Sequence, residues 1–229
     1  GPAVPNWEKE ALRLAIVGVE FTDVRHNDKI TPRNLERAIL STGEYRDRGV
    51  TGENVHGSLN DYIREVSSGK LRLEGKAHDW IDVGKRRGDY IQGTGTSNKM
   101  LLLNDAVSRL TQRDRDALNG IDAICFVYAG EPMRVNRGTI YYPHAGTLPY
   151  QKKSIPYFIA PEGGKSMTPI GGFVKPLGQV LGLPDLAART ENLGSEGLGP
   201  WCGMSDPMQT ARPQHYSAWG KGMAGWGVA

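Results

Sequence analysis

The residues best placed to do chemistry lie in the stretch IGGFVKPLGQVLGLPDL, from Ile170 to Leu186. Helical spacing puts Lys175 and Gln179, at positions i and i+4, on the same face of a helix. Gly182 predicts the end of that helix, and Asp185 follows in the turn. A helix that presents two side chains four residues apart, then a glycine turn and a third polar residue, is a scaffold for a catalytic zinc site.

The side chains on this scaffold do not suit zinc chemistry. Zinc at such positions is bound by neutral imidazoles, and a glutamate beside the first of them acts as general base. Lys175 is protonated at neutral pH, and Gln179 is a weak ligand compared with imidazole. Pro176 carries no acid–base group at the place of the glutamate. Asp185 alone could not hold zinc usefully, so we expect neither metal nor hydrolysis here.

The same helix has an inward face and an unusual proline. Its apolar residues recur at helical spacing and should pack inward: Phe173, Leu177, Val180 and Leu181. Thr168 and Pro169 predict where the helix begins. Pro176 would then lie in the helix interior, where it cannot donate to the carbonyl of Gly172, at a local cost of about 3 kcal/mol. We therefore expect a kinked helix or one that begins late.

The elements around this helix predict a mixed α/β domain. Apolar runs bounded by turn signals predict strands at 12–21, 70–80, 121–128, 139–142 and 155–159. Capping signals and helical periodicity predict helices at 31–40, 59–69 and 100–118, with Thr31 and Ser58 as the N-caps of the first two. After residue 186 the chain is rich in glycine and irregular, and a short helix is predicted within 214–226.

Composition narrows the classes of protein to consider. The 229 residues include 28 Lys and Arg and 25 Asp and Glu, which leaves a net charge of +3. That balance excludes strongly basic nucleic-acid-binding proteins. No apolar run approaches the about 18 residues that a membrane span needs. Glycine supplies 30 residues, nearly twice the usual share of about 7%, which indicates many tight turns or close backbone approaches.

Four weaker motifs point to no chemistry. Gly163-Gly164-Lys165-Ser166 lacks the first glycine of a phosphate-binding loop, because Ile159 stands there. Gly93 and Gly95 are expected in a turn, and Arg87-Gly88-Asp89 in a solvated turn. Cys125 and Cys202 are too few for a disulfide framework; they could pair or stay free, and nothing local activates either one. Three tryptophans are expected in the core or in a cleft wall: Trp201, Trp219 and Trp226.

In order along the chain, several motifs resemble the immune-inhibitor-A-type secreted bacterial zinc metalloproteases. The helix of that family reads approximately GxFxHExGHxLGLPDL, and GGFVKPLGQVLGLPDL matches its frame almost throughout. LRLAIVGVEFTD resembles the first strand of the family, and GSLNDYIREVSSGKLRLEGKAHDWIDV its segment of helix and strand. NGIDAICFVYAG is similar to the strand before the active site. GLGPWCGMSDP resembles the segment of the methionine turn, and QHYSAWGKGMAGW the closing signature.

This resemblance implies a zincin-like catalytic-domain fold. It predicts a twisted mixed sheet with an active-site helix over residues 3–186, and a glycine-rich C-terminal part over 187–229 that holds Met204 in the methionine turn. By position, Lys175 and Gln179 replace the two zinc-binding histidines, Pro176 replaces the catalytic glutamate, and Asp185 keeps the family's aspartate. Either Lys175 pairs with Asp185 in place of the metal charge, or Lys175 and Gln179 form an ordinary solvated face.

The function implied is a catalytically inactive, peptidase-like domain, residues 1–229, of a longer protein that is secreted or sits in the cell envelope. Gly1 and Pro2 are expected to be a cloning remnant. No cofactor is expected, whereas active relatives use zinc. The expected partner is a peptide or protein in the former substrate cleft, extended along the sheet edge, and not a nucleic acid or a membrane. The alternative is an active zinc endopeptidase with His144, His215 and Asp185 as ligands; a phosphate-binding enzyme is a weaker third.

Overall fold

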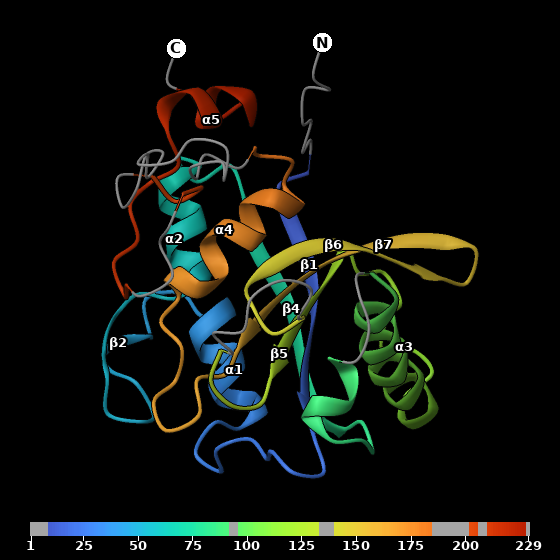
Figure 1. Ribbon diagram of the computed structural model, residues 1–229. Coiled ribbons are helices and arrows are strands. Elements are labelled where there is room, and N and C mark those ends of the chain that lie inside the picture. The colour runs from blue at the N-terminus through green and yellow to red at the C-terminus, as the bar shows by residue number, and fades with distance from the viewer. Residues whose placement is uncertain (1–8, 92–95, 133–139, 185–201, 206–209, 228–229) are drawn as a thin grey trace, which may run out of the picture.

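The computed structural model describes residues 9–91, 96–132, 140–184, 202–205 and 210–227. These residues form a mixed α/β structure around one central sheet, with helices on both of its faces (Figure 1). Asp185 and Trp201 lie outside the described residues, as does most of the glycine-rich stretch after residue 186. The predicted α/β class is confirmed.

The central sheet has five strands in the order β4-β1-β5-β7-β6. They are β1 (Ala11–Glu20), β4 (Arg72–Asp82), β5 (Ala123–Tyr128), β6 (His144–Tyr150) and β7 (Lys153–Pro161). β1 pairs in parallel with β4 and β5, and β7 pairs in parallel with β5. β6 runs antiparallel to β7 and forms an edge of the sheet. All six residues of the central strand β5 are buried, as expected where helices cover both faces.

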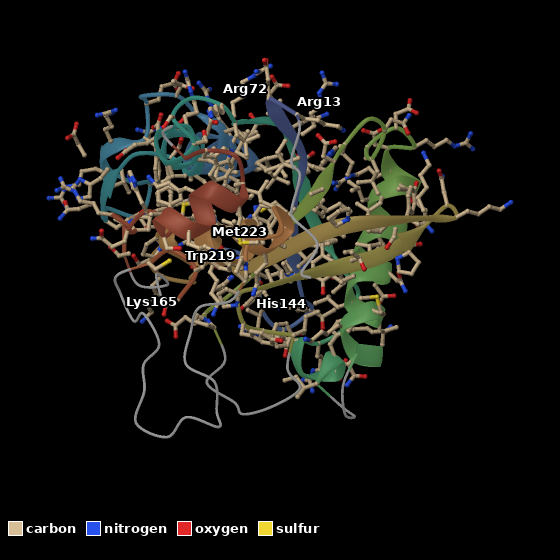
Figure 2. All side chains as sticks on the ribbon, turned by 90° about the horizontal axis from the view of Figure 1, so that it is seen from above. Arg13, Arg72, His144, Lys165, Trp219 and Met223 are labelled. Carbon is tan, nitrogen blue, oxygen red and sulfur yellow. The ribbon has the colours of Figure 1, made fainter. Side chains whose placement is uncertain are left out.

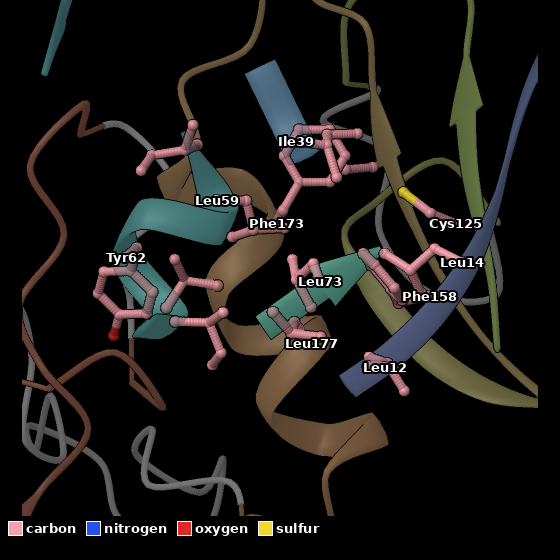
Figure 3. Close-up of a cluster of buried hydrophobic side chains, with 14 of the residues drawn as sticks. Leu12, Leu14, Ile39, Leu59, Tyr62, Leu73, Cys125, Phe158, Phe173 and Leu177 are labelled. Carbon is pink, nitrogen blue, oxygen red and sulfur yellow. The ribbon is translucent and has the colours of Figure 1, made fainter. Parts of the chain in front are cut away.

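Three helices cover one face: α1 (Pro32–Leu40), α2 (Leu59–Val66) and α4 (Gly171–Val180). Side-chain caps mark the start of the first two helices. The Thr31 hydroxyl accepts a hydrogen bond from the Asn34 amide, and Ser58 and Asp61 form a capping box. Figure 3 shows the core beneath them, where Phe173 and Leu177 of α4 meet side chains of α2 and of the sheet.

The opposite face is covered by α3 (Thr96–Arg113), whose Leu102, Leu103, Ala106 and Leu110 belong to a second buried cluster. Four smaller elements of the described chain lie outside these layers. The hairpin of β2 (Arg46–Arg48) and β3 (Asn54–His56) forms a separate two-stranded sheet, and α5 (Ala218–Met223) lies near the C-terminus. The 3-10 helix η1 (Arg87–Tyr90) precedes α3. No helix among the described residues is both long and apolar enough to cross a membrane.

Most predicted elements are confirmed, with shifted ends. The strand expected at 139–142 is wrong: residues 140–143 form no strand, and β6 begins at His144. The helix expected at 100–118 ends at Arg113, because Asp114 to Gly120 turn the chain into β5. The hairpin β2–β3 was not predicted, since its polar three-residue strands carry no periodic signal.

Candidate functional site

The helix α4 begins at Gly171, two residues after Pro169. Thr168 does not cap it: Ile170 is at the N-cap position and makes no side-chain capping bond, and the Thr168 amide donates to the carbonyl of Glu162 at 2.7 Å. The first helical amide, that of Gly171, donates to the carbonyl of Thr210 at 3.1 Å. The late start was predicted, but it does not bring Pro176 into the first turn, and the helix is continuous across this proline.

The end of α4 follows the sequence prediction. Gly182 has φ +85°, a left-handed conformation that suits glycine. The amide of Leu183 donates to the carbonyl of Gly178 at 2.8 Å, which closes the last turn as in a Schellman motif. Phe173, Leu177 and Leu181 are buried as predicted, and Val180 is half-buried against the same core.

The positions at which a zinc site would have its ligands carry unsuitable groups. Lys175 and Gln179 are half-buried, so this face is not the fully solvated one of the simpler alternative. Pro176 is buried and contributes only methylene groups. An ammonium, a pyrrolidine ring and a carboxamide do not fit a zinc ion that needs imidazole, carboxylate or thiolate donors. Asp185 lies outside the described residues, so its pairing with Lys175 stays a prediction.

A tight turn places Met204 directly beneath α4. In this turn the Ser205 amide donates to the carbonyl of Cys202 at 3.0 Å, and the Met204 amide donates to the Cys202 sulfur at 3.4 Å. Met204 is 1% exposed. A methyl group added to Gly178 would lie 2.2 Å from the Met204 sulfur, so this sulfur packs against the helix backbone where no Cβ intervenes.

A second contact ties the C-terminal segment to the same helix. The buried hydroxyl of Tyr216 donates to the carbonyl of Val174 at 2.7 Å. The Gly203 amide donates to the carbonyl of His215 at 3.2 Å, which joins the methionine-containing turn to the segment that carries Tyr216. The described turn therefore packs under α4 and forms a floor beneath this helix.

Cys125 and Cys202 are both buried and free, so the pairing left open by the sequence does not form. Burial raises the pKa of the Cys125 thiol far above its usual range, which disfavours the nucleophilic thiolate. Cys202 contributes its sulfur as an acceptor within the turn. Both cysteines therefore act as small core residues.

The two histidines of the alternative ligand set have other partners. His144 is buried, with Nδ1 2.8 Å from the Tyr142 carbonyl and Nε2 3.2 Å from the Tyr157 hydroxyl, and burial lowers its pKa to about 4. His215 contacts Glu65 through Nε2 at 2.8 Å. Within the part of the chain that the structure describes, no group of three His, Cys, Asp or Glu side chains could hold a metal.

The loop from Gly163 to Ser166 binds a carboxylate of the chain itself. Glu162 is 1% exposed, and its carboxylate accepts hydrogen bonds from the amides of Asn27, Gly130 and Gly164 at 3.0, 3.2 and 3.1 Å. Burial nevertheless raises the pKa of Glu162. Because this carboxylate takes the Gly164 amide, the loop is not prepared for phosphate.

Two further predictions need correction. Arg87 is not in a solvated turn: it is half-buried in η1, with its guanidinium over the rings of Tyr128 and Tyr141 at 5.4 and 4.6 Å. Trp226 is buried as expected, but Trp219 is 57% exposed on α5 (Figure 2). Helical spacing in the six residues of α5 turns Trp219 outward while Gly220 faces the protein.

Sequence reasoning missed two adjoining pockets beside the N-terminal end of α4. One has a volume of about 370 Å³ and lies between the hairpin β2–β3, the loop 163–170 and the start of α4. The other, about 750 Å³, lies between the hairpin, α2 and residues 211–215. Neither is lined by Lys175, Pro176 or Gln179. Polar residues of an irregular hairpin gave no sequence signal for them.

Comparison with known proteins adds no family assignment. The chain matches no protein-family model, and no curated protein is significantly similar to it. The resemblance to zinc metalloproteases therefore rests on the ordered motifs alone.

Proposed function

We propose that this chain is a non-hydrolytic, zincin-like domain that keeps the framework of a zinc endopeptidase and binds peptides without cleaving them. The observation that carries the proposal is the packing of Met204 against Gly178 of α4. The same helix has Lys175, Pro176 and Gln179 at the positions of the metal ligands and the general base. A floor under the helix supports the proposed framework, and the side chains at the three ligand positions are ones that neither bind zinc nor activate water.

The arrangement of the sheet supports the same proposal. A mostly parallel sheet with one antiparallel edge strand, next to a helix that ends in a glycine turn, agrees with the mixed sheet and active-site helix of the zincin-like fold. The helix α4 packs against β7 and β6, so the altered positions belong to a helix beside the sheet edge.

The strand β6 is the proposed peptide-binding edge. Its inner side pairs with β7 along all seven residues, from His144 to Tyr150, and no described strand pairs with its outer side. An extended peptide can add to such an edge through main-chain hydrogen bonds. Without a general base or metal, a peptide held there would leave intact.

Restoring the missing groups tests the catalytic part. We expect protein purified without a metal-affinity column to contain no stoichiometric zinc by elemental analysis and to cleave no casein. The variant K175H/P176E/Q179H should bind one zinc ion and show cleavage that a chelator abolishes. The matched variant K175H/P176Q/Q179H should bind zinc with little cleavage, because it lacks the general base. One equivalent of zinc with chelator-sensitive cleavage in the unaltered chain would refute the proposal.

Hydrogen exchange tests the binding part. A mixture of tryptic casein peptides should slow the exchange of outward-facing amides in β6, and the peptides should be recovered uncut by mass spectrometry. Peptides methylated at the backbone nitrogen should protect these amides less, because they lack the donors for strand pairing. Protection that is equal for both kinds of peptide would contradict binding by strand addition.

A further inference from the structure

The smaller pocket beside α4 has a charge opposite to that of the whole protein. Two carboxylates line it, those of Glu53 and Glu131, and no lysine or arginine is among its described lining residues. The chain as a whole carries a net charge of +3. The remaining wall is partly apolar, with Met167 and Ile170 among its members. We call this cavity of about 370 Å³ the anionic pocket. Such a lining suits a group that is both cationic and partly aliphatic.

Glu53 is held in place and has unused acceptor capacity. One of its carboxylate oxygens accepts a hydrogen bond from the Thr51 hydroxyl, which in turn accepts the Met167 amide at 2.9 Å. The other oxygen lies against Gly49 and has no hydrogen-bond partner although it is buried. The Glu53 side chain as a whole is half-buried and lines the pocket, so its negative charge favours a cationic group that enters there.

The same pocket adjoins the edge of β3 that no described strand pairs with. All three residues of β3 line it, and no residue of β2 does. The Gly49 amide donates to the carbonyl of Glu53 at 2.8 Å, so in this antiparallel ladder the next hydrogen-bonded pair is Asp47 with Val55. The intervening residues, Asn54 and His56, therefore direct their backbone N–H and C=O groups away from β2, as a strand does when a partner strand can add to it.

The anionic pocket continues into the larger one. Both are lined by the segment Val55–Gly57, by Ile170 and by Ala211, so they form one trough along the hairpin. The larger pocket is lined by charges of both signs: the carboxylates of Asp47, Asp61 and Glu65, and the guanidinium groups of Arg46 and Arg212. Because the larger pocket extends the trough beyond the anionic pocket, it gives room for peptide residues on one side of a basic residue.

From these observations we infer that the trough binds an extended peptide, which pairs with β3 and places an arginine or lysine side chain in the anionic pocket. The backbone groups of Asn54 and His56 supply the strand pairing, and Glu53 and Glu131 receive the cation. This site is separate from the β6 edge, and it stands whether or not hydrolysis has been lost at α4.

Three blocked peptides test the assignment by calorimetry: acetyl-Val-Val-Arg-Val-Val-amide, its citrulline counterpart, and the arginine peptide methylated at backbone nitrogens. Citrulline has nearly the shape of arginine without its charge. We expect the arginine peptide to bind at least about tenfold more tightly than either control, because charge-assisted hydrogen bonds are the stronger ones. Amide NMR signals of Asn54 and His56 should shift with the arginine peptide.

Substitutions of the two glutamates test whether their charge binds the arginine side chain. E131Q changes an exposed side chain and should preserve the fold, and E53Q keeps an acceptor for Thr51. Each should weaken the arginine peptide severalfold without changing the citrulline peptide, while E10Q, at a distant exposed carboxylate, should change neither. Equal affinities for arginine and citrulline, or no effect of E53Q and E131Q, would overturn the inference. Binding of n-butylguanidine as tight as that of the peptide would overturn the role of β3.

Discussion

Replacement of Gly178 by alanine probes the contact between α4 and the Met204 turn. In an open position of a helix this change should stabilise the protein by up to about 1 kcal/mol, because alanine has the higher helix propensity. At Gly178 the new methyl group would lie 2.2 Å from the Met204 sulfur and 3.1 Å from a ring carbon of Tyr216. Both of these neighbours are about 99% buried, so neither can move freely into solvent.

The balance of these two effects sets the expected magnitude. Overpacking in a filled core costs about 1–3 kcal/mol, which exceeds the gain in propensity. We therefore expect G178A to lower the free energy of unfolding by about 1–2 kcal/mol, measured by urea denaturation followed by circular dichroism. G222A in α5 is the matched control, since a methyl group there meets no atom within 4 Å and should be neutral or stabilising.

A double-mutant cycle separates crowding from other causes. M204A alone should cost about 2–5 kcal/mol, because it leaves a cavity under α4. In that background G178A should become stabilising, since its methyl group enters the vacated space. The coupling between the two sites would then be positive and at least about 1 kcal/mol. If G178A has the same effect with Met204 present and absent, the turn does not pack under the helix and the proposed floor is refuted.

Three other substitutions have defined outcomes. P176A should raise the free energy of unfolding by about 1 kcal/mol, since a recovered helical amide (about 3 kcal/mol) outweighs two lost buried methylenes (about 0.8 kcal/mol each); urea denaturation measures this. Y216F should lower it by about 1 kcal/mol, because the buried 2.7 Å hydrogen bond from the Tyr216 hydroxyl to the Val174 carbonyl is lost. H144Q should flatten the pH dependence of stability. Burial lowers the pKa of His144 from 6.5 to about 4, so the unfolded chain binds the proton more readily. Stability from this residue is complete above pH 6.5 and falls by up to about 3 kcal/mol toward pH 4. Equal slopes for the variant and the parent between pH 7 and 4.5 would contradict the assignment.

Sequence patterns predicted the elements whose burial or capping is periodic. The runs that became β1 and β5 were recognisable because both faces of these strands are covered, and α1 and α2 began where Thr31 and Ser58 predicted. The strand β6 was misplaced because HAGTLPY contains glycine and proline and lacks alternation; its position depends on pairing with β7. Pairing between distant segments leaves no local signal.

The candidate site was also predictable only in part. The inward face of α4 and its glycine turn were predictable from spacing. The trough was not predictable. It is formed by the hairpin, the loop 163–170 and residues 211–215, which no local pattern brings together.

The packing of α4 explains how its framework tolerates Pro176. An interior proline costs about 3 kcal/mol, whereas burial of a large apolar side chain contributes about 1.5–3 kcal/mol. Phe173, Val174 and Leu177 are each at least 97% buried, so their combined contribution exceeds the loss. The helix is therefore held by its inward face and by the floor around Met204, and neither depends on the residues that would bind zinc. For this reason the side chains on the outward face of α4 can be substituted while the backbone of the helix is retained.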